Sequence, residues 1–480
     1  MSYTKKLLEW EQAKYSEAMS NNGLSAAQVE ILRERVEEQM PQLVQELTDL
    51  VAIESVGADS DKDEEMEESA RFVAGKLREL GFDVSIRTST DAQGNPGRPA
   101  VVGLKKTFPG RPTVLLYAHH DVQPVGDTTG WMTEPLVATE RDGRLYGRGA
   151  ADDGAGIVTH LGSLRALHDA LGVNVVVFIE GEEEISSPTF INFIAENHDD
   201  LKADVIIVAD SSVWTEEIPA ITASLRGTVT VDVKVKALDH AVHSGGFGGP
   251  IVDAVTAAAH LIAGLHDENG DVSVPGLENG PDWEIDWDEE SFIKDAGAVC
   301  GLELQGTGSL TTRLWSKPAL SVIGMDVRPV AEAANALAPE CKFRLSLRVS
   351  PTQDAQEAAE TLVAYLESQS PFGAKVCTKV VECGSGFIAD TNHEYVQVMH
   401  RALSLAWQRE SVNIGQGGSI KFIADFKQEF PDAAVIVTGI EDPTSNAHSE
   451  NESVSLKVLK NATLAEAIFM AELAETAATN

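Results

Sequence analysis

Short apolar runs alternate with helical patterns in the first half of the chain. Three runs have the length of strands and end in polar residues, and they lie at 112–120, 173–180 and 204–210. Two intervening segments, 154–171 and 188–198, carry apolar residues at helical spacing. Apolar strands that alternate with helices indicate a mostly parallel sheet flanked by helices on both faces. In such sheets, functional residues collect at the carboxyl ends of the strands.

The chain ahead of this region predicts helices followed by short strands. Residues 25–39 carry apolar side chains at helical spacing, and Ser25 stands where an N-cap is expected. Pro41 suits the first turn of a helix, so we expect a second helix over 41–53. A third helix is expected to end at Gly81, and strands are expected over 82–89, 99–107 and 112–120.

From about Arg226 the pattern changes to alternating apolar and polar residues, typical of a sheet with one exposed face. The predicted order β-α-β-β-α-β indicates a two-layer α+β unit. Its elements are expected at 226–237, 250–265, 319–327, 341–349, 355–368 and 374–383, with an irregular stretch at 267–317. Helical and buried-strand patterns then return. We therefore expect an α/β domain, residues 1–218 and 387–480, interrupted by an inserted α+β domain, residues 219–386.

The composition narrows the functional classes. Of 480 residues, 43% are apolar, and 37 basic and 75 acidic residues make the formal net charge −38. So acidic a chain is a poor general binder of nucleic acid, which needs a basic surface. The longest apolar runs are too short to span a membrane, and residues 1–17 lack the apolar core of a secretory signal. We expect no nucleic-acid or membrane partner and a cytoplasmic location.

Candidate metal ligands follow the predicted strands. His119 and Asp121 are two residues apart at the end of one strand, so their side chains share a face. Asp152 and Asp153 stand in a glycine-rich turn before a helix, and Asp210 ends another buried strand. Taken singly, each has an ordinary explanation, because a histidine can belong to the core and an aspartate can cap a helix or a turn.

Two further stretches enlarge this set. Residues 180–184 contain four glutamates directly after an apolar run, where like charges repel. His448 stands in a polar loop, where a lone histidine usually faces solvent. Together the stretches place two histidines and several carboxylates at strand ends of one predicted sheet. Oxygen and imidazole ligands without cysteine suit zinc, manganese or cobalt, and the surplus of ligands favours two metal ions.

Motifs for rival chemistries are absent from the sequence. It contains no GxxxxGK[ST] phosphate loop, no GxSxG elbow and no HExxH metal motif. The glycine-rich segments HSGGFGGP and GQGGSIKF lack the adjacent Lys-Ser/Thr pair of a phosphate loop. They can still bring backbone N–H groups close to a ligand.

In their order, these stretches resemble the M20 family of metallopeptidases, which includes carnosine-type dipeptidases, carboxypeptidases and N-acyl-amino-acid deacylases. The matching segments are LVAIESV, YAHHDVQPV, LYGRGAADDGAG, IEGEEEISS, VIIVADSSVW, HSGGFGGP, GQGGSI and NAHSENES. They extend from about residue 43 to residue 454. The ordered set is far more specific than any one segment.

The resemblance implies a dinuclear metal site with a glutamate base. The implied ligands are His119 and Asp210 for one metal ion, Glu184 and His448 for the other, and Asp152 as the bridge, with a cis peptide bond to Asp153. Asp121 would orient His119, and Glu183 would be the general base in the family pattern E-G-x-E-E. Glu180 would support the strand end, and Glu182, at the variable position, would face solvent.

A second group of residues would bind the substrate. His243 resembles the family histidine that reaches into the partner subunit's active site and polarises the scissile carbonyl. The residues implied for the terminal carboxylate of the substrate are Arg348, Gly418 and Ser419, and Asn335 is a further binding residue. The inserted domain would be a lid and dimerisation domain. The length of the stretch 267–317 fits the dipeptidase branch.

Two positions depart from the usual family motifs: Gly154 stands where lysine is common, and Lys421 where proline is common. Neither departure removes a ligand. We expect a homodimeric dipeptidase with two Zn²⁺ ions per subunit, Mn²⁺ or Co²⁺ being substitutes, that hydrolyses dipeptides or short peptides with a free C-terminus. The alternatives are an N-acyl-amino-acid deacylase, of the acetylornithine or succinyl-diaminopimelate type, and a non-catalytic metal-binding or scaffold protein.

Overall fold

The computed structural model describes residues 23–418 and 421–479, which form two compact units. Within the described residues, unit 1 comprises 23–223, 389–413 and 425–479, and unit 2 comprises 224–388 and 414–424. In this part of the chain, no helix is both long enough and apolar enough to cross a membrane.

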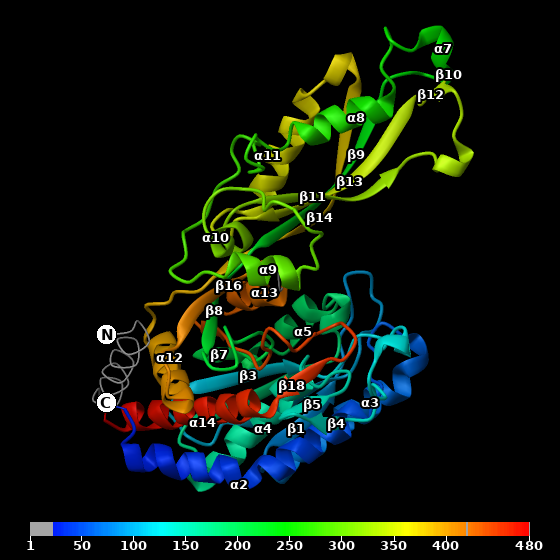
Figure 1. Ribbon diagram of the computed structural model, residues 1–480. Coiled ribbons are helices and arrows are strands. Elements are labelled where there is room, and N and C mark those ends of the chain that lie inside the picture. The colour runs from blue at the N-terminus through cyan, green and yellow to red at the C-terminus, as the bar shows by residue number, and fades with distance from the viewer. Residues whose placement is uncertain (1–22, 419–420, 480) are drawn as a thin grey trace. The chain divides into compact units, whose positions relative to one another are not determined.

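The centre of unit 1 is a six-stranded sheet, of which β1, β3 and β7 are labelled in Figure 1. The strand order is β1-β2-β6-β3-β7-β17. Its strands are β1 (Asp83–Arg87), β2 (Ala100–Lys105), β3 (Thr113–His119), β6 (Asn174–Glu180), β7 (Val205–Val208) and β17 (Ala434–Val437). The pairs β6-β3, β3-β7 and β7-β17 are parallel, whereas β1-β2 and β2-β6 are antiparallel. The predicted α/β class is confirmed.

Helices flank this sheet. Four of them pack together, and they are α2 (Ala26–Val51), α4 (Gly154–Leu167), α12 (Glu394–Trp407) and α14 (Leu456–Thr479). Helix α3 (Asp63–Glu79) packs against β1 and β2. The other helices are α5 (Phe190–Glu196), α6 (His198–Leu201) and α13 (Lys421–Glu429). A small antiparallel sheet joins β18 (Ser453–Ser455), β5 (Arg144–Tyr146) and β4 (Thr139–Arg141).

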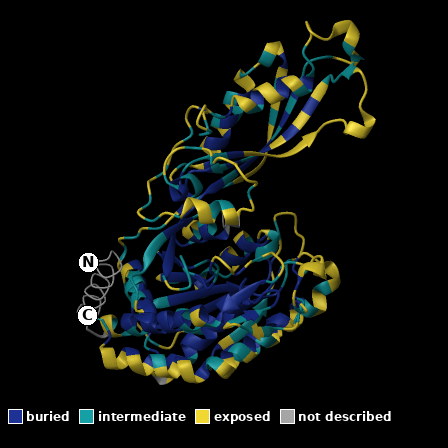
Figure 2. Ribbon diagram, in the orientation of Figure 1, coloured by how far each residue is buried: buried dark blue, intermediate teal, exposed yellow. Residues whose placement is uncertain are grey.

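Both faces of the sheet are buried at its central strands β3, β6 and β7 (Figure 2). On one face, Val114 and Leu116 of β3 belong to a core that α2, α4 and α14 share. On the other, the ring of Tyr117 packs edge-on against Phe178 of β6 and Phe426 of α13. Residues of β3, β6 and β7 meet apolar partners on one side or the other, which explains why these central strands are almost continuously apolar.

Helix α2 corrects one prediction. Ser25 caps it as expected, in a capping box with Gln28. The helix then continues through Pro41 to Val51, so the expected break into two helices is wrong. A proline removes one backbone hydrogen bond and usually kinks a helix interior. Here Leu43 and Leu47, two and six residues beyond it, are fully buried, and their packing keeps the helix in one piece.

Unit 2 contains an antiparallel sheet in the order β11-β13-β9-β14. In chain order its elements are β9 (Gly227–Lys236), α8 (Ala254–Ala263), β11 (Ala319–Asp326), β13 (Glu340–Val349), α11 (Ala355–Ser368) and β14 (Lys375–Gly384), the predicted β-α-β-β-α-β order. Alternate residues such as Val231 and Leu345 form a core with α8 and α11. The polar residues between them point to the opposite face of the sheet.

Smaller elements complete the fold. Strand β10 (Val242–His243) pairs with β12 (Ala336–Leu337), next to the short helix α7 (Ser244–Phe247). A three-stranded sheet contains β15 (Phe387–Ile388), β8 (Ala220–Leu225) and β16 (Val412–Gln416). The stretch predicted to be irregular is partly helical, because α9 (Glu289–Asp295) and α10 (Leu310–Trp315) lie within it.

Candidate metal and catalytic site

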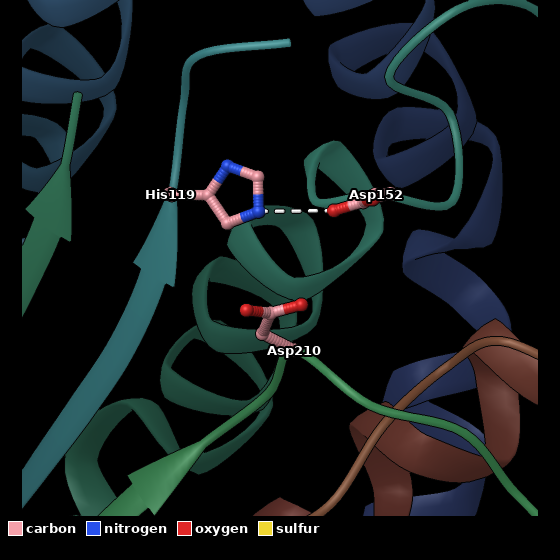
Figure 3. A group of neighbouring side chains, drawn as sticks. All are labelled: His119, Asp152 and Asp210. Atoms are coloured by element: carbon pink, nitrogen blue, oxygen red, sulfur yellow. Dashed lines mark hydrogen bonds and ion pairs between the residues drawn. The ribbon is translucent and has the colours of Figure 1, made fainter. Parts of the chain in front are cut away.

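The parallel strands of unit 1 bring candidate ligands to one edge of the sheet. His119 is the last residue of β3, Glu180 ends β6, and Asp210 follows β7. Strands β6, β3 and β7 are adjacent and parallel, so their carboxyl ends meet. Figure 3 shows His119 hydrogen-bonded to Asp152, which lies before α4, with Asp210 beside them.

Asp152 lies between two histidines. Its Oδ1 is 3.0 Å from Nε2 of His119, and its Oδ2 is 2.8 Å from Nε2 of His448. Nε2 of His448 is also 3.1 Å from Oε2 of Glu184. A carboxylate with a histidine on each side has the geometry expected of a ligand that bridges two cations.

The five predicted ligands form two groups that share Asp152. The ligand atoms of His119, Asp152 and Asp210 all lie within 4.8 Å of one another, and so do those of Asp152, Glu184 and His448. Carboxylate oxygens and imidazole nitrogens suit zinc and related divalent metals. Each group offers three protein ligands, the number typical of catalytic zinc sites. The residues present therefore fit two divalent cations.

Electrostatics favour positive charge in this cluster. Hydrogen bonds with Asp152 and Glu184 raise the pKa of His448 to about 11. Burial opposes a charge on His119, yet hydrogen bonds with Asp121 and Asp152 raise its pKa well above the usual value. The same carboxylates would attract divalent cations, which bind neutral imidazole and so displace these protons.

The adjacent aspartates at 152 and 153 have different surroundings. Oδ1 of Asp153 accepts the backbone N–H of Gly156 at 3.1 Å and caps α4, while its Oδ2 accepts the N–H of His119 at 3.2 Å. The peptide bond between Asp152 and Asp153 is cis, as the resemblance implies. The helix-cap explanation thus applies to Asp153, and Asp152 belongs to the ligand cluster.

Asp121 connects His119 to the glutamate turn. The nearest partner of His119 Nδ1 is the backbone carbonyl of Asp121, at 3.0 Å, and the Asp121 carboxylate is 3.4 Å away. The two carboxylate oxygens accept the backbone N–H groups of Glu183 and Glu184, at 3.1 and 3.0 Å. Asp121 therefore positions the turn as well as the histidine.

The glutamates of the turn have separate roles in the structure. Glu180 is buried and accepts the hydroxyl hydrogen of Tyr117 at 2.6 Å. Burial raises the pKa of Glu180 to about 8. Glu184 accepts a hydrogen bond from Nε2 of Gln123 at 2.7 Å while it faces His448. The sequence reasoning did not predict a role for Gln123, although this residue stands in the segment YAHHDVQPV.

The prediction that Glu182 faces solvent is wrong. Glu182 is only 4% exposed. The carboxylate accepts the backbone N–H of Arg98 at 2.9 Å and the hydroxyl hydrogen of Thr189 at 2.5 Å. These donors offset the cost of burying a charge. Glu182 therefore anchors the turn to Arg98 and Thr189.

Glu183 has the electrostatic surroundings of a base. Burial and then the nearby charge of Asp210 raise the pKa of Glu183 well above its usual value. Burial also raises the pKa of Asp210 to about 7, with Asp152 adding to the shift. A carboxylate whose pKa lies closer to neutral is better matched to proton transfer at neutral pH.

Glu452 is a supporting residue that the sequence reasoning missed. Its carboxylate is fully buried, and Oε1 accepts the backbone N–H groups of Ala151 and Asp152 at 2.9 and 3.1 Å. Oε2 accepts hydrogen bonds from Nη1 of Arg148 at 2.6 Å and from the N–H of Gly149 at 3.1 Å. Burial raises the pKa of Glu452 to about 7. Its only signal was its place in the segment NAHSENES.

The predicted substrate-binding residues that the structure describes lie in unit 2. His243 and Asn335 are exposed neighbours at the β10-β12 pair, where the Asn335 carbonyl accepts the N–H of the residue after His243. Arg348 is half-buried on β13, and Gly418 is exposed. Ser419 lies outside the described residues.

Comparison with known proteins identifies the family. The model of the family described as Peptidase family M20/M25/M40 matches residues 115–472. The chain belongs to this family. The resemblance indicated by the ordered motifs is therefore confirmed, and the chain is a hydrolase of a peptidase family. The roles of individual residues stay predictions.

Relatives of this M20 peptidase cover most of its length. The Cysteinylglycine-S-conjugate dipeptidase of Corynebacterium striatum is 34% identical over 435 residues, which are 89% of this chain and 94% of the relative. The Beta-Ala-His dipeptidase of Rattus norvegicus is 28% identical over 441 residues, covering 86% and 89% of the two chains. The crystal structure of human carnosine dipeptidase 1 matches with a TM-score of 0.73 at 25% identity, covering 93% of this chain and 98% of that one.

Proposed function

We propose that this M20 peptidase hydrolyses dipeptides, or short peptides with a free C-terminus, at a site that holds two divalent cations, zinc being the expected metal. One observation carries the proposal: Asp152 contacts both His119 and His448, and each histidine belongs to a separate three-ligand group. The names of the similar dipeptidases from Corynebacterium striatum and rat support the choice of dipeptides.

The side chains of the site suit amide hydrolysis. When bound, divalent cations would polarise the scissile carbonyl and acidify water. In our proposal Glu183 accepts a proton from the attacking water at its carboxylate and returns it to the leaving amine. Asp121 and Glu182 support this step indirectly: Asp121 accepts the backbone N–H of Glu183, and Glu182, in the same turn, accepts the backbone N–H of Arg98.

Substrate recognition is assigned to residues of unit 2. Arg348 would bind the terminal carboxylate of the peptide with two parallel hydrogen bonds, helped by Gly418 and Ser419. Asn335 would contact the substrate beside His243. We assign His243 to the active site of a partner subunit, where it would polarise the scissile carbonyl. A homodimer formed through residues 219–386 and a cytoplasmic location belong to the same proposal.

A substrate panel tests the activity directly. Purified enzyme, prepared with Zn²⁺, Mn²⁺ or Co²⁺, is assayed on Cys-Gly, β-Ala-His and simple dipeptides beside N-acetyl amino acids. We expect faster hydrolysis of a dipeptide, and elemental analysis should find about two metal ions per chain. A chelator should abolish turnover, and metal should restore it. Faster deacylation than dipeptide hydrolysis would refute the proposal in favour of a deacylase, and chelator-resistant activity would refute the metal centre.

Sedimentation tests the dimer. A dimer at assay concentrations is expected, together with a loss of activity on dilution to monomer. A His243→Ala subunit should be rescued in part when it is mixed with a Glu183→Gln subunit, because each mixed dimer keeps one complete site. A fully active monomer would contradict the role given to His243.

A further inference from the structure

Arg226 connects two segments of unit 2 that are far apart in the sequence. It lies between β8 and β9 and is only 6% exposed. Its guanidinium donates hydrogen bonds to the carbonyl of Gly417 at 3.2 Å and to the carbonyls of Lys317 and Arg313 at 3.2 and 3.5 Å. One end of this link is therefore the C-terminal end of α10, whose carbonyls lack partners within the helix. The other end is the glycine-rich segment 415–418.

Only glycine permits this packing of the segment. A Cβ atom at Gly417 would lie 2.9 Å from Nη2 of Arg226, and one at Gly415 would lie 2.6 Å from Cβ of Trp315. Both distances are shorter than carbon atoms tolerate without movement. The segment thus rests directly on Arg226 and on the last residue of α10, and its conformation depends on both.

Arg226 also lies close to Arg348. In the register of β9 and β13, Arg348 is opposite Thr228. Alternation along a strand places residues two apart on one face, so Arg226 and Arg348 share the face away from α8 and α11. Burial, and then the charge of Arg348, lower the pKa of Arg226 to about 10.

Within the described part of the chain, the guanidiniums of Arg226 and Arg348 have no anionic partner. Among the described residues, no carboxylate forms an ion pair or hydrogen bond with either side chain, and the partners of Arg226 are uncharged carbonyls. By contrast, Arg344 on the same strand binds the carboxylate of Asp232 through Nε and Nη2. Two neighbouring cations without a counter-charge favour an anionic ligand, and a carboxylate matches the planar fork of an arginine.

We infer that Arg226 is a positioning residue of the subsite for the substrate's terminal carboxylate: it holds segment 415–418 in place and adds positive charge beside Arg348. The inference rests on the proposed function, because it assumes a substrate with a free carboxylate. Arg226 acts through Gly417 and Arg348 and is not expected to contact the substrate itself. The enzyme's preference for a free C-terminus then depends on a residue about 120 positions away from Arg348 in the sequence.

The test compares a dipeptide with its own C-terminal amide. The substrate is the dipeptide hydrolysed fastest in the panel above, and kcat and KM are measured for both forms with wild type, Arg226→Met, Arg226→Lys and Arg344→Met. In Arg226→Met, KM for the dipeptide should rise about tenfold, because the hydrogen bond that holds Gly417 and one of the two positive charges beside the substrate carboxylate are both lost. Its kcat and the kcat/KM of the amide should stay within about twofold, because the amide has no charge for the arginines to recognise.

The remaining variants separate positioning from folding. Arg226→Lys keeps the charge but not the fork, so it should recover part of the lost affinity. Arg344→Met should behave as wild type. If Arg226→Met does not fold, Gly417→Ala replaces it, since the added Cβ must move either the segment or the guanidinium of Arg226 and so disturbs their contact. That variant should raise KM for the dipeptide and not for the amide.

Each outcome has one meaning. An equal fall in kcat/KM for dipeptide and amide, or no change in either, overturns the inference and leaves dipeptide hydrolysis intact. A wild type that hydrolyses the amide as well as the dipeptide refutes the carboxylate subsite together with Arg226. A wild type inactive on every dipeptide refutes the proposed function itself.

Discussion

In unit 1, three carboxylates gather around two histidines, whereas in unit 2 Arg226 and Arg348 lie close together and no carboxylate of the described residues bonds to either. Backbone groups hold the charges in both regions. The carboxylate of Asp121 accepts two N–H groups, and Arg226 donates to three carbonyls. Such dipoles fix a charge in position without neutralising it. The first region therefore favours cations and the second an anion.

The two regions differ in how they relieve repulsion. Carboxylates and imidazoles can exchange protons, and Asp152 and Glu184 hold protons strongly on His448. Guanidiniums stay protonated at neutral pH. The two arginines in unit 2 can therefore relieve their repulsion only by binding an anion or by moving apart. Unlike the cluster in unit 1, their preference for an anion does not depend on protonation. Four substitutions test this comparison.

The largest effect is expected at Glu183. Glu183→Gln keeps the shape of the side chain but cannot accept a proton, so kcat for a dipeptide should fall about 10³-fold. Metal content should be unchanged, because the predicted ligands remain. The exposed Glu64→Gln serves as control. Unchanged turnover in the Glu183 variant would refute the base assignment, and lost metal would make Glu183 a ligand.

A large effect on stability is expected at Glu452. Glu452→Gln removes the negative charge beside Arg148 and leaves a buried guanidinium without a counter-charge, which should lower the free energy of unfolding by about 3–5 kcal/mol. Urea unfolding measures the change. The exposed neighbour Glu450→Gln should be neutral. If both variants unfold alike, the buried ion pair does not support the turn before α4.

An intermediate effect is expected at Arg348. Arg348→Met should raise KM for a dipeptide about 10- to 100-fold, because a bidentate contact with the terminal carboxylate is lost. The kcat value should change less. Arg344→Met on the same strand is the matched control, since Arg344 already has Asp232 as partner. Equal KM values for the two variants would contradict the assignment of the carboxylate subsite to Arg348.

The smallest effect is expected at Glu182. Glu182→Gln keeps the volume but weakens the bonds to Arg98 and Thr189, so the free energy of unfolding should fall by about 1–2 kcal/mol. Turnover at saturating substrate should fall by less than in Glu183→Gln. A loss of activity as large as that of Glu183→Gln would mean that the roles within the turn are assigned to the wrong glutamates.

Much of the architecture could be predicted from residue patterns. The alternation of apolar strands with helices indicates the α/β sheet, and polar residues at strand ends indicate its functional edge, since adjacent parallel strands end together. The continuous helix through Pro41 was not predictable, because its stability comes from Leu43 and Leu47 packing against distant segments. The helix forms because the free energy gained by burying these apolar side chains exceeds the cost of a proline in the helix interior.

Within the site, the sequence by itself determined which residue types assemble, in five short segments whose order is specific to the family. Tertiary structure alone decided which role each of the neighbouring acidic residues takes. Asp152 faces two histidines while Asp153 caps α4, and Glu182 is buried beside Arg98 although its position in the motif is variable. Neighbouring carboxylates are chemically alike, so their roles depend on the groups that the fold brings near them. For the same reason, only the fold could show the contacts of Glu452 and Arg226.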